Sequence, residues 1–357
     1  MTSVNNSSID FWKGRRVAIT GHTGFKGSWL TLWLLSLGAE ILGISLDDRK
    51  PEDLFVAAGI SKNCHEFLCD ISNEGIWKAG LIDFQPEVLF HLAAQSLVRV
   101  SYENPLSTFR VNVMGTAQVL EASRSIESLQ TIIVVTTDKV YRDVQLRQPF
   151  VENDHLGGHD PYSASKSAAE IVTSSYVQSF FQSSNVGVST CRAGNVIGGG
   201  DWATNRLIPD AIRAWKRNIP AQVRNPAAVR PWQHVLEPLW GYMTVAELSF
   251  ENYELATSYN FGPRNSDEVT VAEIMDIAVA SYGDVSYSVL EDANSPHESE
   301  WIALNSNLAR DNLGVEPLLQ HYEAVEWTID WYRKYLSGQD ARNLCLDQIS
   351  EYQRLIP

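Results

Sequence analysis

The feature that most constrains the fold is a glycine-rich turn near the N-terminus of the chain. It follows a short apolar run at Arg16–Thr20 and leads into a helical pattern at Ser28–Leu37. The glycines stand at positions 21, 24 and 27, a spacing that allows a tight turn, close approach of backbone to a pyrophosphate and close packing of helix on strand. This order predicts a dinucleotide-binding βαβ unit, although a purely structural turn would show the same spacing.

The next segment supports the same interpretation. A second strand is expected at Glu40–Leu46, and Asp47 follows it, twenty residues beyond Gly27, where a carboxylate binds the ribose hydroxyls of NAD. Arg49 lies two residues further on and could instead meet the 2′-phosphate of NADP. NAD is therefore the preferred cofactor, and NADP the alternative.

Strands and helices continue to alternate along the first half of the chain. Strand-like apolar runs lie at 67–70, 88–94 and 132–135. This alternation predicts an α/β fold with a doubly wound parallel sheet of the Rossmann type. Asp70 could meet an adenine or cap a helix beside Ser72, and the small Ala93 and Ala94 could press against a cofactor or pack in the core.

A polar stretch, Thr136-Thr137-Asp138-Lys139, ends the apolar run at 132–135. Ligands and catalytic side chains collect at the carboxyl ends of parallel strands, so this stretch is a candidate active-site edge, with a solvated loop junction as the alternative. Tyr162 and Lys166 follow on a helix expected at 161–181, one turn apart on one face. An ammonium group beside a phenol, helped by an oxidised nicotinamide, lowers the pKa of the tyrosine from about 10 toward neutrality, which suits a base.

A change of local charge marks the second half of the chain. Between Arg192 and Pro231 seven basic residues stand against two acidic ones, in a chain of net charge −15. The forked guanidinium group of arginine suits phosphate oxygens, so Arg206 and Arg230 are candidates for binding an anionic ligand such as a diphosphate. The basic residues at Arg213–Arg217 are instead expected to form a solvated helix face. We expect an NAD-binding domain over residues 1–190, joined by a segment returning near 232–262, and a substrate-binding lobe over 191–357.

Other properties exclude several classes of protein. The acidic net charge argues against a nucleic-acid-coating surface. The polar N-terminus resembles no secretory signal and the apolar run at 29–37 is too short to span a membrane, so a cytoplasmic location is expected. The eight histidines form no HExxH or comparable arrangement, which predicts no metal.

Four longer motifs carry a resemblance to a known family: Gly21–Leu30, Tyr162–Lys166, Arg192–Trp202 and Arg230–Val235. From about Phe11 to Tyr335 the chain resembles the extended short-chain dehydrogenase/reductase superfamily, and within it the CDP-glucose branch of the sugar-nucleotide 4,6-dehydratases. The resemblance implies a Rossmann-type sheet with a smaller C-terminal lobe, bound NAD and a nucleotide-sugar substrate. It also implies a homodimer through helices 105–124 and 161–181, and a place in deoxysugar biosynthesis such as that of lipopolysaccharide O-antigen.

The resemblance assigns roles to the polar strand end. Sugar-nucleotide 4,6-dehydratases usually carry Thr-Asp-Glu there, whereas the CDP-glucose branch carries Lys in the third position, as in Thr137-Asp138-Lys139. Tyr162 would take the proton of the 4-hydroxyl with Lys166 and Thr137 holding the site. Asp138, protonated, would assist departure of the 6-hydroxyl. Lys139 would be the base at C5, or would orient Asp138 or the sugar.

The implied reaction converts CDP-D-glucose to CDP-4-keto-6-deoxy-D-glucose by transient oxidation at C4, loss of water across C5 and C6, and return of hydride to C6. The implied cofactor contacts are Gly21, Thr23, Gly24, Phe25, Gly27, Asp47, Asp70, Ile71, Leu92, Ala93, Ala94, Gln95, Asn112, Thr136, Tyr162, Lys166 and Arg192. The implied substrate contacts are Ser96, Arg99, Asn195, Arg206, Leu207, Asn225, Arg230, His234, Arg264 and His297.

Alternatives remain open at this point. The chain has Asp143, Leu146, Ala303 and Asn305 where the family commonly has Asn, Trp, Lys and Asp, which leaves a dehydratase for another nucleotide-glucose possible. A sugar-nucleotide 4-epimerase shares the fold and the tyrosine but would usually carry small or hydroxyl residues in place of Asp138 and Lys139. A non-catalytic NAD-sensing protein would gain nothing from retaining the catalytic residues.

Overall fold

The central element is a seven-stranded parallel sheet with the strand order β11-β6-β5-β4-β1-β2-β3. The computed structural model describes residues 10–73, 75–142, 147–255, 257–264, 269–290 and 301–357. All pairs of neighbouring strands in the sheet are parallel. The strands are β1 (Arg16–Thr20), β2 (Glu40–Ser45), β3 (His65–Leu68), β4 (Val88–His91), β5 (Thr131–Val135), β6 (Gly187–Ala193) and β11 (Ser258–Phe261). The strand order reverses between β1 and β4, which confirms the doubly wound Rossmann-type sheet.

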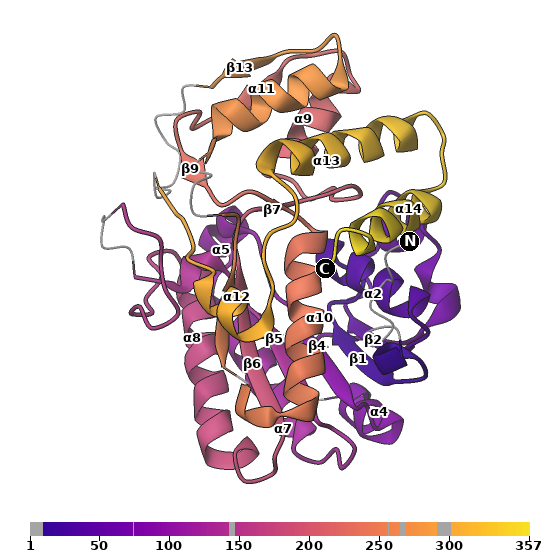
Figure 1. Ribbon diagram of the computed structural model, residues 1–357, viewed down its shortest axis with the longest axis vertical. Helices are drawn as coiled ribbons and strands as arrows, with labels where there is room; N and C mark the ends of the chain where they lie inside the picture. The colour runs from indigo at the N-terminus through magenta and orange to yellow at the C-terminus, as the bar shows by residue number, and fades with distance from the viewer. Residues whose placement is uncertain (1–9, 74, 143–146, 256, 265–268, 291–300) are drawn as a thin grey trace.

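Helices cover both faces of this sheet (Figure 1). One face packs on α2 (Phe25–Ser36) and α10 (Leu236–Glu251), with α14 (Ala341–Gln353) beside α2. The other packs on α4 (Ile76–Phe84), α7 (Gly115–Ser123) and α8 (Pro161–Tyr176). Because side chains alternate along each strand, the sheet separates two buried cores. The first core includes Ile19, Phe90 and Ile133, and the second Ala18, Leu89 and Ile132.

The remaining helices connect the sheet or build the second lobe. Near the sheet lie α3 (Leu54–Ala57), α5 (Val98–Glu103), α6 (Pro105–Phe109) and α12 (Asn307–Leu313). Above the carboxyl edge of the sheet lie α9 (Leu207–Trp215), α11 (Val271–Tyr282) and α13 (His321–Leu336) (Figure 1). Three small two-stranded sheets complete the lobe: β7 (Val196–Ile197) with β10 (Gln233–His234), β9 (Val229–Arg230) with β12 (Val269–Thr270), and β8 (Ala221–Val223) with β13 (Tyr287–Val289).

Several expected elements differ in length from those in the structure. The third strand is at His65–Leu68, and the fourth ends at His91, because Leu92–Ala94 leave the sheet to line the cavity described below. The two long expected helices each contain a π-helical turn, at Arg110–Met114 and Val177–Phe181. The division at residue 190 stays a prediction; β6 runs on to Ala193, and the stretch 232–262 contributes α10 and β11.

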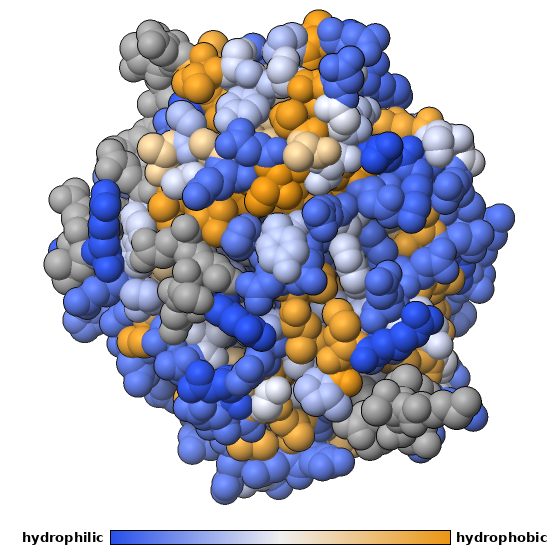
Figure 2. Space-filling model, turned by 45° about the horizontal axis from the view of Figure 1, so that its top comes forward, coloured by the Kyte–Doolittle hydropathy of each residue, from blue (hydrophilic) through white to orange (hydrophobic). Residues whose placement is uncertain are grey.

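Most apolar side chains lie in the two cores, and the visible surface is mainly polar. In Figure 2 most of the visible face is hydrophilic, with apolar side chains in patches between polar ones. Among the residues that the structure describes, no helix combines the length and apolar character needed to cross a bilayer.

The glycine turn yields a test of the fold. A methyl group at Gly27 would be driven against the backbone of Gly21 and His22, so Gly27→Ala should lower the free energy of unfolding by about 1–3 kcal/mol. Gly24→Ala is the matched control, because its added atom would come no closer than 3.4 Å, to the carbonyl oxygen of Gly21. Thermal and denaturant unfolding of the two variants measure the difference, and equal stability would contradict the packing described here.

Candidate active site

A cavity of about 750 Å³ lies at the carboxyl edge of the sheet, where the strand ends meet the second lobe. Its walls come from the glycine turn, the ends of β2, β3, β4 and β5, the start of α8 and the segment 193–232. A site at the switch point of strand order is where open α/β sheets bind ligands. The residues expected to bind cofactor that line it are Gly21, Thr23, Gly24, Phe25, Gly27, Asp70, Ile71, Leu92, Ala93, Ala94, Gln95, Thr136, Tyr162 and Lys166.

The glycine turn brings backbone close to backbone. Gly21 has φ +76°, and a Cβ there would stand 2.7 Å from the backbone nitrogen of Ala93. Gly24 is the N-cap of α2, so the amide groups of the first turn of this helix face the cavity. Helix N-termini of this kind bind phosphate groups. The turn therefore fits the pyrophosphate of a dinucleotide.

The strand end after β5 carries the expected catalytic residues. Thr137 donates a hydrogen bond to Oδ1 of Asp138 at 2.9 Å, and both side chains are buried. Oδ2 of Asp138 is buried without a hydrogen-bond partner among the described residues. Burial raises the pKa of Asp138, although the positive charge of Lys139 and the hydrogen bond from Thr137 oppose the rise. The carboxyl group is thus biased toward the protonated form that an acid needs.

Tyr162 and Lys166 lie on the first turns of α8, which begins with Asp160 as N-cap and Pro161 in its first turn. The Nζ of Lys166 donates to the carbonyl oxygen of Val135 at 3.0 Å, and burial lowers the pKa of Lys166 to about 8. Burial raises the pKa of Tyr162 to about 12, opposed by a hydrogen bond with Thr137. Desolvation of the phenolate outweighs the favourable contacts. The lowering expected beside an ammonium group and an oxidised nicotinamide stays a prediction.

A buried ion pair holds this strand end against α8. Both carboxylate oxygens of Glu170 accept from Arg192, from Nε at 2.9 Å and from Nη2 at 2.8 Å. Glu170 also accepts from the hydroxyl groups of Thr136 at 2.5 Å and Thr190 at 2.6 Å. The pair therefore ties α8 to β5 and β6 one turn beyond Lys166.

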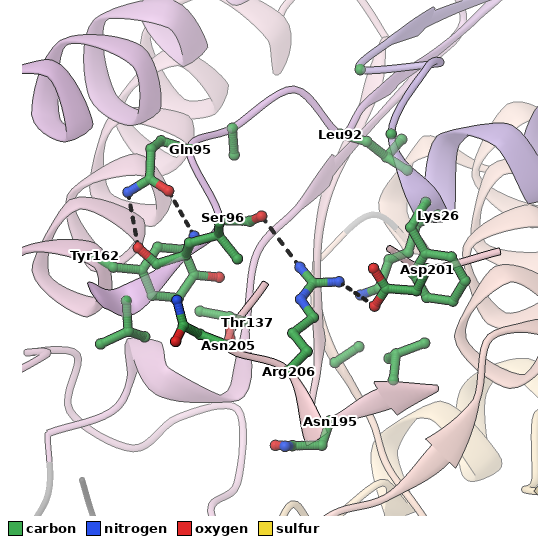
Figure 3. A pocket seen from close by; sticks show the side chains of 18 of the residues that line it. Lys26, Leu92, Gln95, Ser96, Thr137, Tyr162, Asn195, Asp201, Asn205 and Arg206 are labelled. Carbon is green, nitrogen blue, oxygen red and sulfur yellow. Dashed lines mark hydrogen bonds and ion pairs between the residues drawn. The ribbon is translucent and has the colours of Figure 1, made fainter. Parts of the chain in front are cut away.

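The second lobe contributes cationic and amide side chains to the cavity. Arg206 bonds Asp201 through Nη1 at 2.8 Å and Ser96 through Nη2 at 3.3 Å (Figure 3). Burial opposes the charge of Arg206, yet the carboxylate of Asp201 raises its pKa. The expected substrate contacts that line the cavity are Ser96, Arg99, Asn195, Arg206, Leu207, Asn225 and Arg230.

Three expected contacts lie behind the cavity wall. Arg192 does not line the cavity because Glu170, the hydroxyl of Tyr141 and the carbonyl of Glu152 hold its guanidinium. Asn112 is buried and bonds both backbone groups of Gln95, so it shapes the loop that lines the cavity. His234 is fully buried beside the rings of Trp29 and Trp327, so it packs in the core.

Other expected contacts lie elsewhere. Asp47 does not line the cavity and pairs with Arg49 at 3.2 Å, while its neighbour Asp48 lines the cavity. Arg264 donates at 3.4 Å to the carbonyl of Pro317, outside the cavity lining. His297, like Asp143 and Leu146, lies outside the described residues. Ala303 and Asn305 pair with the backbone of Phe150.

Some lining residues were missed from the sequence. Lys26 lies in the first turn of α2 and lines the cavity. A cation at the positive end of a helix is unfavourable, and this signal was present in the sequence. Further side chains that were not expected are Asp201, Asn205, Gln222, Arg224 and Trp232, for which spacing alone offers no signal.

One cluster of metal-ligating residue types occurs in the described part of the chain. Ligand atoms of His22, Cys64 and Glu66 lie within 4.8 Å of one another. Glu66 already accepts from Arg49 at 3.0 Å and contacts His22 at 2.9 Å. The guanidinium thus supplies the positive charge that this carboxylate needs, and the absence of a metal stays a prediction.

The sheet order, the glycine turn and the Tyr162/Lys166 pair beside a strand end define a nucleotide-binding protein of the short-chain dehydrogenase/reductase type. A family model described as GDP-mannose 4,6 dehydratase matches residues 18–335, and the chain belongs to this family.

Comparison with individual proteins narrows the relationship. The chain is 41% identical over 349 residues to a CDP-glucose 4,6-dehydratase from Salmonella typhimurium, covering 96% of this chain and 97% of that protein. A UDP-glucose 4-epimerase from Thermus thermophilus, solved in complex with NAD, has a TM-score of 0.76 and 26% identity, covering 89% of this chain and 99% of the other. A dTDP-glucose 4,6-dehydratase from Streptomyces venezuelae, solved with NAD and TYD bound, shares the fold with a TM-score of 0.77 and 22% identity, covering 92% and 99%.

The buried ion pair yields a prediction. Glu170→Gln would leave the Arg192 guanidinium buried without its counter-charge, so it should cost about 3–5 kcal/mol of stability. Glu121→Gln is the control, because Glu121 pairs with Arg124 at the surface at 2.7 Å, and such pairs contribute about 1 kcal/mol or less. Denaturant unfolding measures both, and a loss at Glu170 no larger than at Glu121 would show that the pair does not hold the strand end.

Proposed function

We propose that this protein dehydrates CDP-D-glucose to CDP-4-keto-6-deoxy-D-glucose with NAD as its cofactor. The observation that carries the proposal is the buried carboxyl group of Asp138, which follows the end of β5. Asp138 is close enough to Tyr162 for its charge to raise the pKa of the tyrosine. Its raised pKa favours the protonated acid that the departing 6-hydroxyl requires. The 41% identity to a CDP-glucose 4,6-dehydratase over nearly the full length supports the same reaction.

Several features of the site fit NAD. The backbone approach at Gly21 and the N-terminus of α2 suit the pyrophosphate. Arg49, which could otherwise meet a 2′-phosphate, is held by Glu66 at 3.0 Å and by Asp47 at 3.2 Å, which favours NAD over NADP. When bound, NAD supplies the acceptor for a hydride from the sugar and later the donor that returns it.

Oxidation at C4 requires a base for the 4-hydroxyl proton, and we assign this role to Tyr162. The hydrogen bond with Thr137 and the positive charge of Arg206 both favour the phenolate, against the burial that raises the pKa of this tyrosine. Lys166 is held beside the strand end by its bond to the Val135 carbonyl. Thr137 and Lys166 would hold the site around the sugar, and Tyr162 would take the proton of its 4-hydroxyl.

Elimination of water requires a base at C5 and an acid at O6. The 4-keto group acidifies the hydrogen at C5. Lys139, as the neutral amine, would take this proton, and Asp138 would give its own proton to the 6-hydroxyl as the C6–O bond breaks and water leaves. Lys139 and Asp138 both line the cavity. A 4-epimerase leaves C6 untouched and needs no such acid, so a buried, proton-holding Asp138 favours the dehydratase.

The nucleotide end of the substrate would be bound by the second lobe. Arg99, Arg206 and Arg230 line the cavity and offer guanidinium groups to a diphosphate. Ser96, Asn195, Leu207 and Asn225 lie on the same walls. We assign these side chains to substrate binding.

We further propose a homodimer built on the helices at 105–124 and 161–181. The corresponding helices α6 and α7 both pack against α8. These helices and the π-helical turn at Arg110–Met114 present large apolar side chains to solvent. Leu106 is 85% exposed, Ile171 61% and Met114 52%. Burying such side chains against a second copy would stabilise the pair by about 25 cal/mol for each Å² of apolar area covered.

The substrate proposal predicts the outcome of one assay. Incubation with CDP-glucose, UDP-glucose, dTDP-glucose and GDP-mannose should give a 4-keto product, detected by its absorbance in alkali, from CDP-glucose with the highest kcat/KM. Absence of keto product from all four would contradict the dehydratase assignment, and a preference for another sugar would contradict the cytidine assignment.

Asp138→Asn tests whether Asp138 is the acid of the elimination step. It keeps the size of the side chain but carries no proton to give, so it should still oxidise the sugar at C4 while product formation falls about 10²–10⁴-fold. Reduction of the bound cofactor, read by its absorbance, separates the two steps. Unchanged product formation would remove Asp138 as the acid.

The dimer proposal predicts the effect of one surface charge. Leu106→Asp should shift the protein toward monomers in sedimentation experiments, because a carboxylate would be buried in the interface. Ile219→Asp is the matched control, since Ile219 is 51% exposed and lies beyond these helices. A monomeric unmodified protein, or a dimer unaffected by Leu106→Asp, would contradict this interface.

A further inference from the structure

Arg206 crosses the cavity between the two lobes. It is the N-cap residue of α9 in the second lobe, and its guanidinium donates to residues on opposite sides. Nη1 bonds Oδ2 of Asp201 at 2.8 Å, and Nη2 bonds the hydroxyl of Ser96, in the loop after β4, at 3.3 Å (Figure 3). One side chain therefore joins the second lobe to the loop that follows β4.

The two contacts of Arg206 differ in strength. Asp201 offers a charged and buried carboxylate, whereas Ser96 is exposed and offers a neutral hydroxyl. A carboxylate accepts more strongly from a guanidinium than a hydroxyl does, because the opposite charges add to the hydrogen bond. A phosphate oxygen is charged as well, so it would displace Ser96 from Arg206. The end of Arg206 at Asp201 is therefore the fixed one, and the end at Ser96 is exchangeable.

Asp201 is itself held in place by the second lobe. Its Oδ1 accepts from the backbone nitrogen of Ala203 at 3.1 Å, and its carbonyl oxygen accepts from the hydroxyl of Tyr332 on α13. Arg213 of α9 donates to the carbonyl of Ala203 at 3.1 Å. Both carboxylate oxygens of Asp201 therefore have a donor, and the direction in which Asp201 holds Arg206 is fixed.

A buried carboxylate in the wall of an anion-binding cavity is unfavourable by itself. It loses its own hydration and repels the phosphates of a ligand, so a functional reason is expected. Positioning is such a reason, because a flexible arginine loses rotamer freedom when it binds a ligand, and this loss weakens binding. Asp201 confines Arg206 before the ligand arrives. Since Nη1 is turned to Asp201, the edge formed by Nε and Nη2 remains for the bidentate contact that phosphate oxygens favour.

We propose that Asp201 is a positioning residue, which holds Arg206 so that the edge formed by Nε and Nη2 binds the diphosphate of the nucleotide sugar. The inference rests on the proposed function. Tyr162 and Arg206 line the same cavity, so a sugar bound at Tyr162 can extend its diphosphate to Arg206. Binding would exchange the bond to Ser96 for bonds to phosphate oxygens and leave the pair with Asp201 intact.

Two variants of Asp201 separate position from charge. Asp201→Asn leaves one acceptor oxygen for two donors, the nitrogen of Ala203 and Nη1 of Arg206, so Arg206 should lose its place. Asp201→Glu keeps the charge and moves it by one methylene group. Both should raise the Kd of CDP for the NAD-saturated protein about fivefold in calorimetry, because the ligand must then order Arg206 itself. Asp311→Asn is the control, since Asp311 pairs with Arg310 at the surface at 3.0 Å.

A double variant shows whether Asp201 acts through Arg206. Arg206→Met should weaken CDP binding more than either variant of Asp201, and adding Asp201→Asn to it should weaken binding no further. Should the asparagine variant not fold, Asp201→Glu takes its place in this comparison. A structural role of Asp201 alone would lower the affinity by the same factor in both backgrounds. That result, or CDP binding that is unchanged or tighter in Asp201→Asn, would overturn the inference.

The binding measurement does not depend on the reaction. Absence of keto product from the unmodified protein would overturn the dehydratase function, whereas CDP binding would still decide the role of Asp201. If UDP, dTDP or GDP binds more tightly than CDP, the cytidine assignment is wrong, and the same variants are measured with that diphosphate. Failure of all four diphosphates to bind would overturn the inference as well.

Discussion

The structure of the site depends on the buried ion pair between Glu170 and Arg192. Glu170 stands four residues after Lys166 and eight after Tyr162 on one helix, so it shares a face with both catalytic side chains. Through Thr136 it holds the end of β5, and through Arg192 and Thr190 it holds β6. A pair of this kind is costly to break because either partner alone would be a buried charge. Its effect here is to fix the distance between the strand end and the helix that carries the base.

Exclusion of water then determines the chemistry of the groups that this pair positions. Burial raises the pKa of Asp138 and Tyr162 and lowers the pKa of Lys166 and Lys26, so in each case it favours the neutral form. A neutral carboxylic acid has a proton to give, and a neutral amine has a lone pair that can take one. The reaction proposed here moves protons at O4, C5 and O6, and the site offers titratable side chains of both kinds around one strand end.

Much of the fold was predictable because it follows from local patterns. The glycine turn, the apolar β-branched runs and the helical pattern after each run predict a doubly wound sheet, and β1, β4 and β5 begin within one residue of their expected positions. The π-helical turns at Arg110–Met114 and Val177–Phe181 leave no comparable signature in the sequence.

The site was predictable at its strand ends and less so elsewhere. Residues that follow a strand directly, such as Thr137, Asp138 and Ala93, line the cavity as expected. Arg192 and His234 lie behind the cavity wall because their partners, Glu170 and the rings of Trp29 and Trp327, come from other elements of the fold, which the local sequence does not show. The burial that raises the pKa of Tyr162 depends on the whole fold, whereas the i, i+4 spacing shows only the neighbouring ammonium.

In the proposed reaction, hydride leaves C4 of the sugar and returns to C6 of the same molecule, with water lost between the two transfers. The most direct measurement is incubation with CDP-glucose that carries deuterium at C4, followed by NMR of the product. We expect a 4-keto-6-deoxy sugar with the deuterium in its C6 methyl group. Deuterium retained at C4, in a sugar that keeps its 6-hydroxyl, would contradict it.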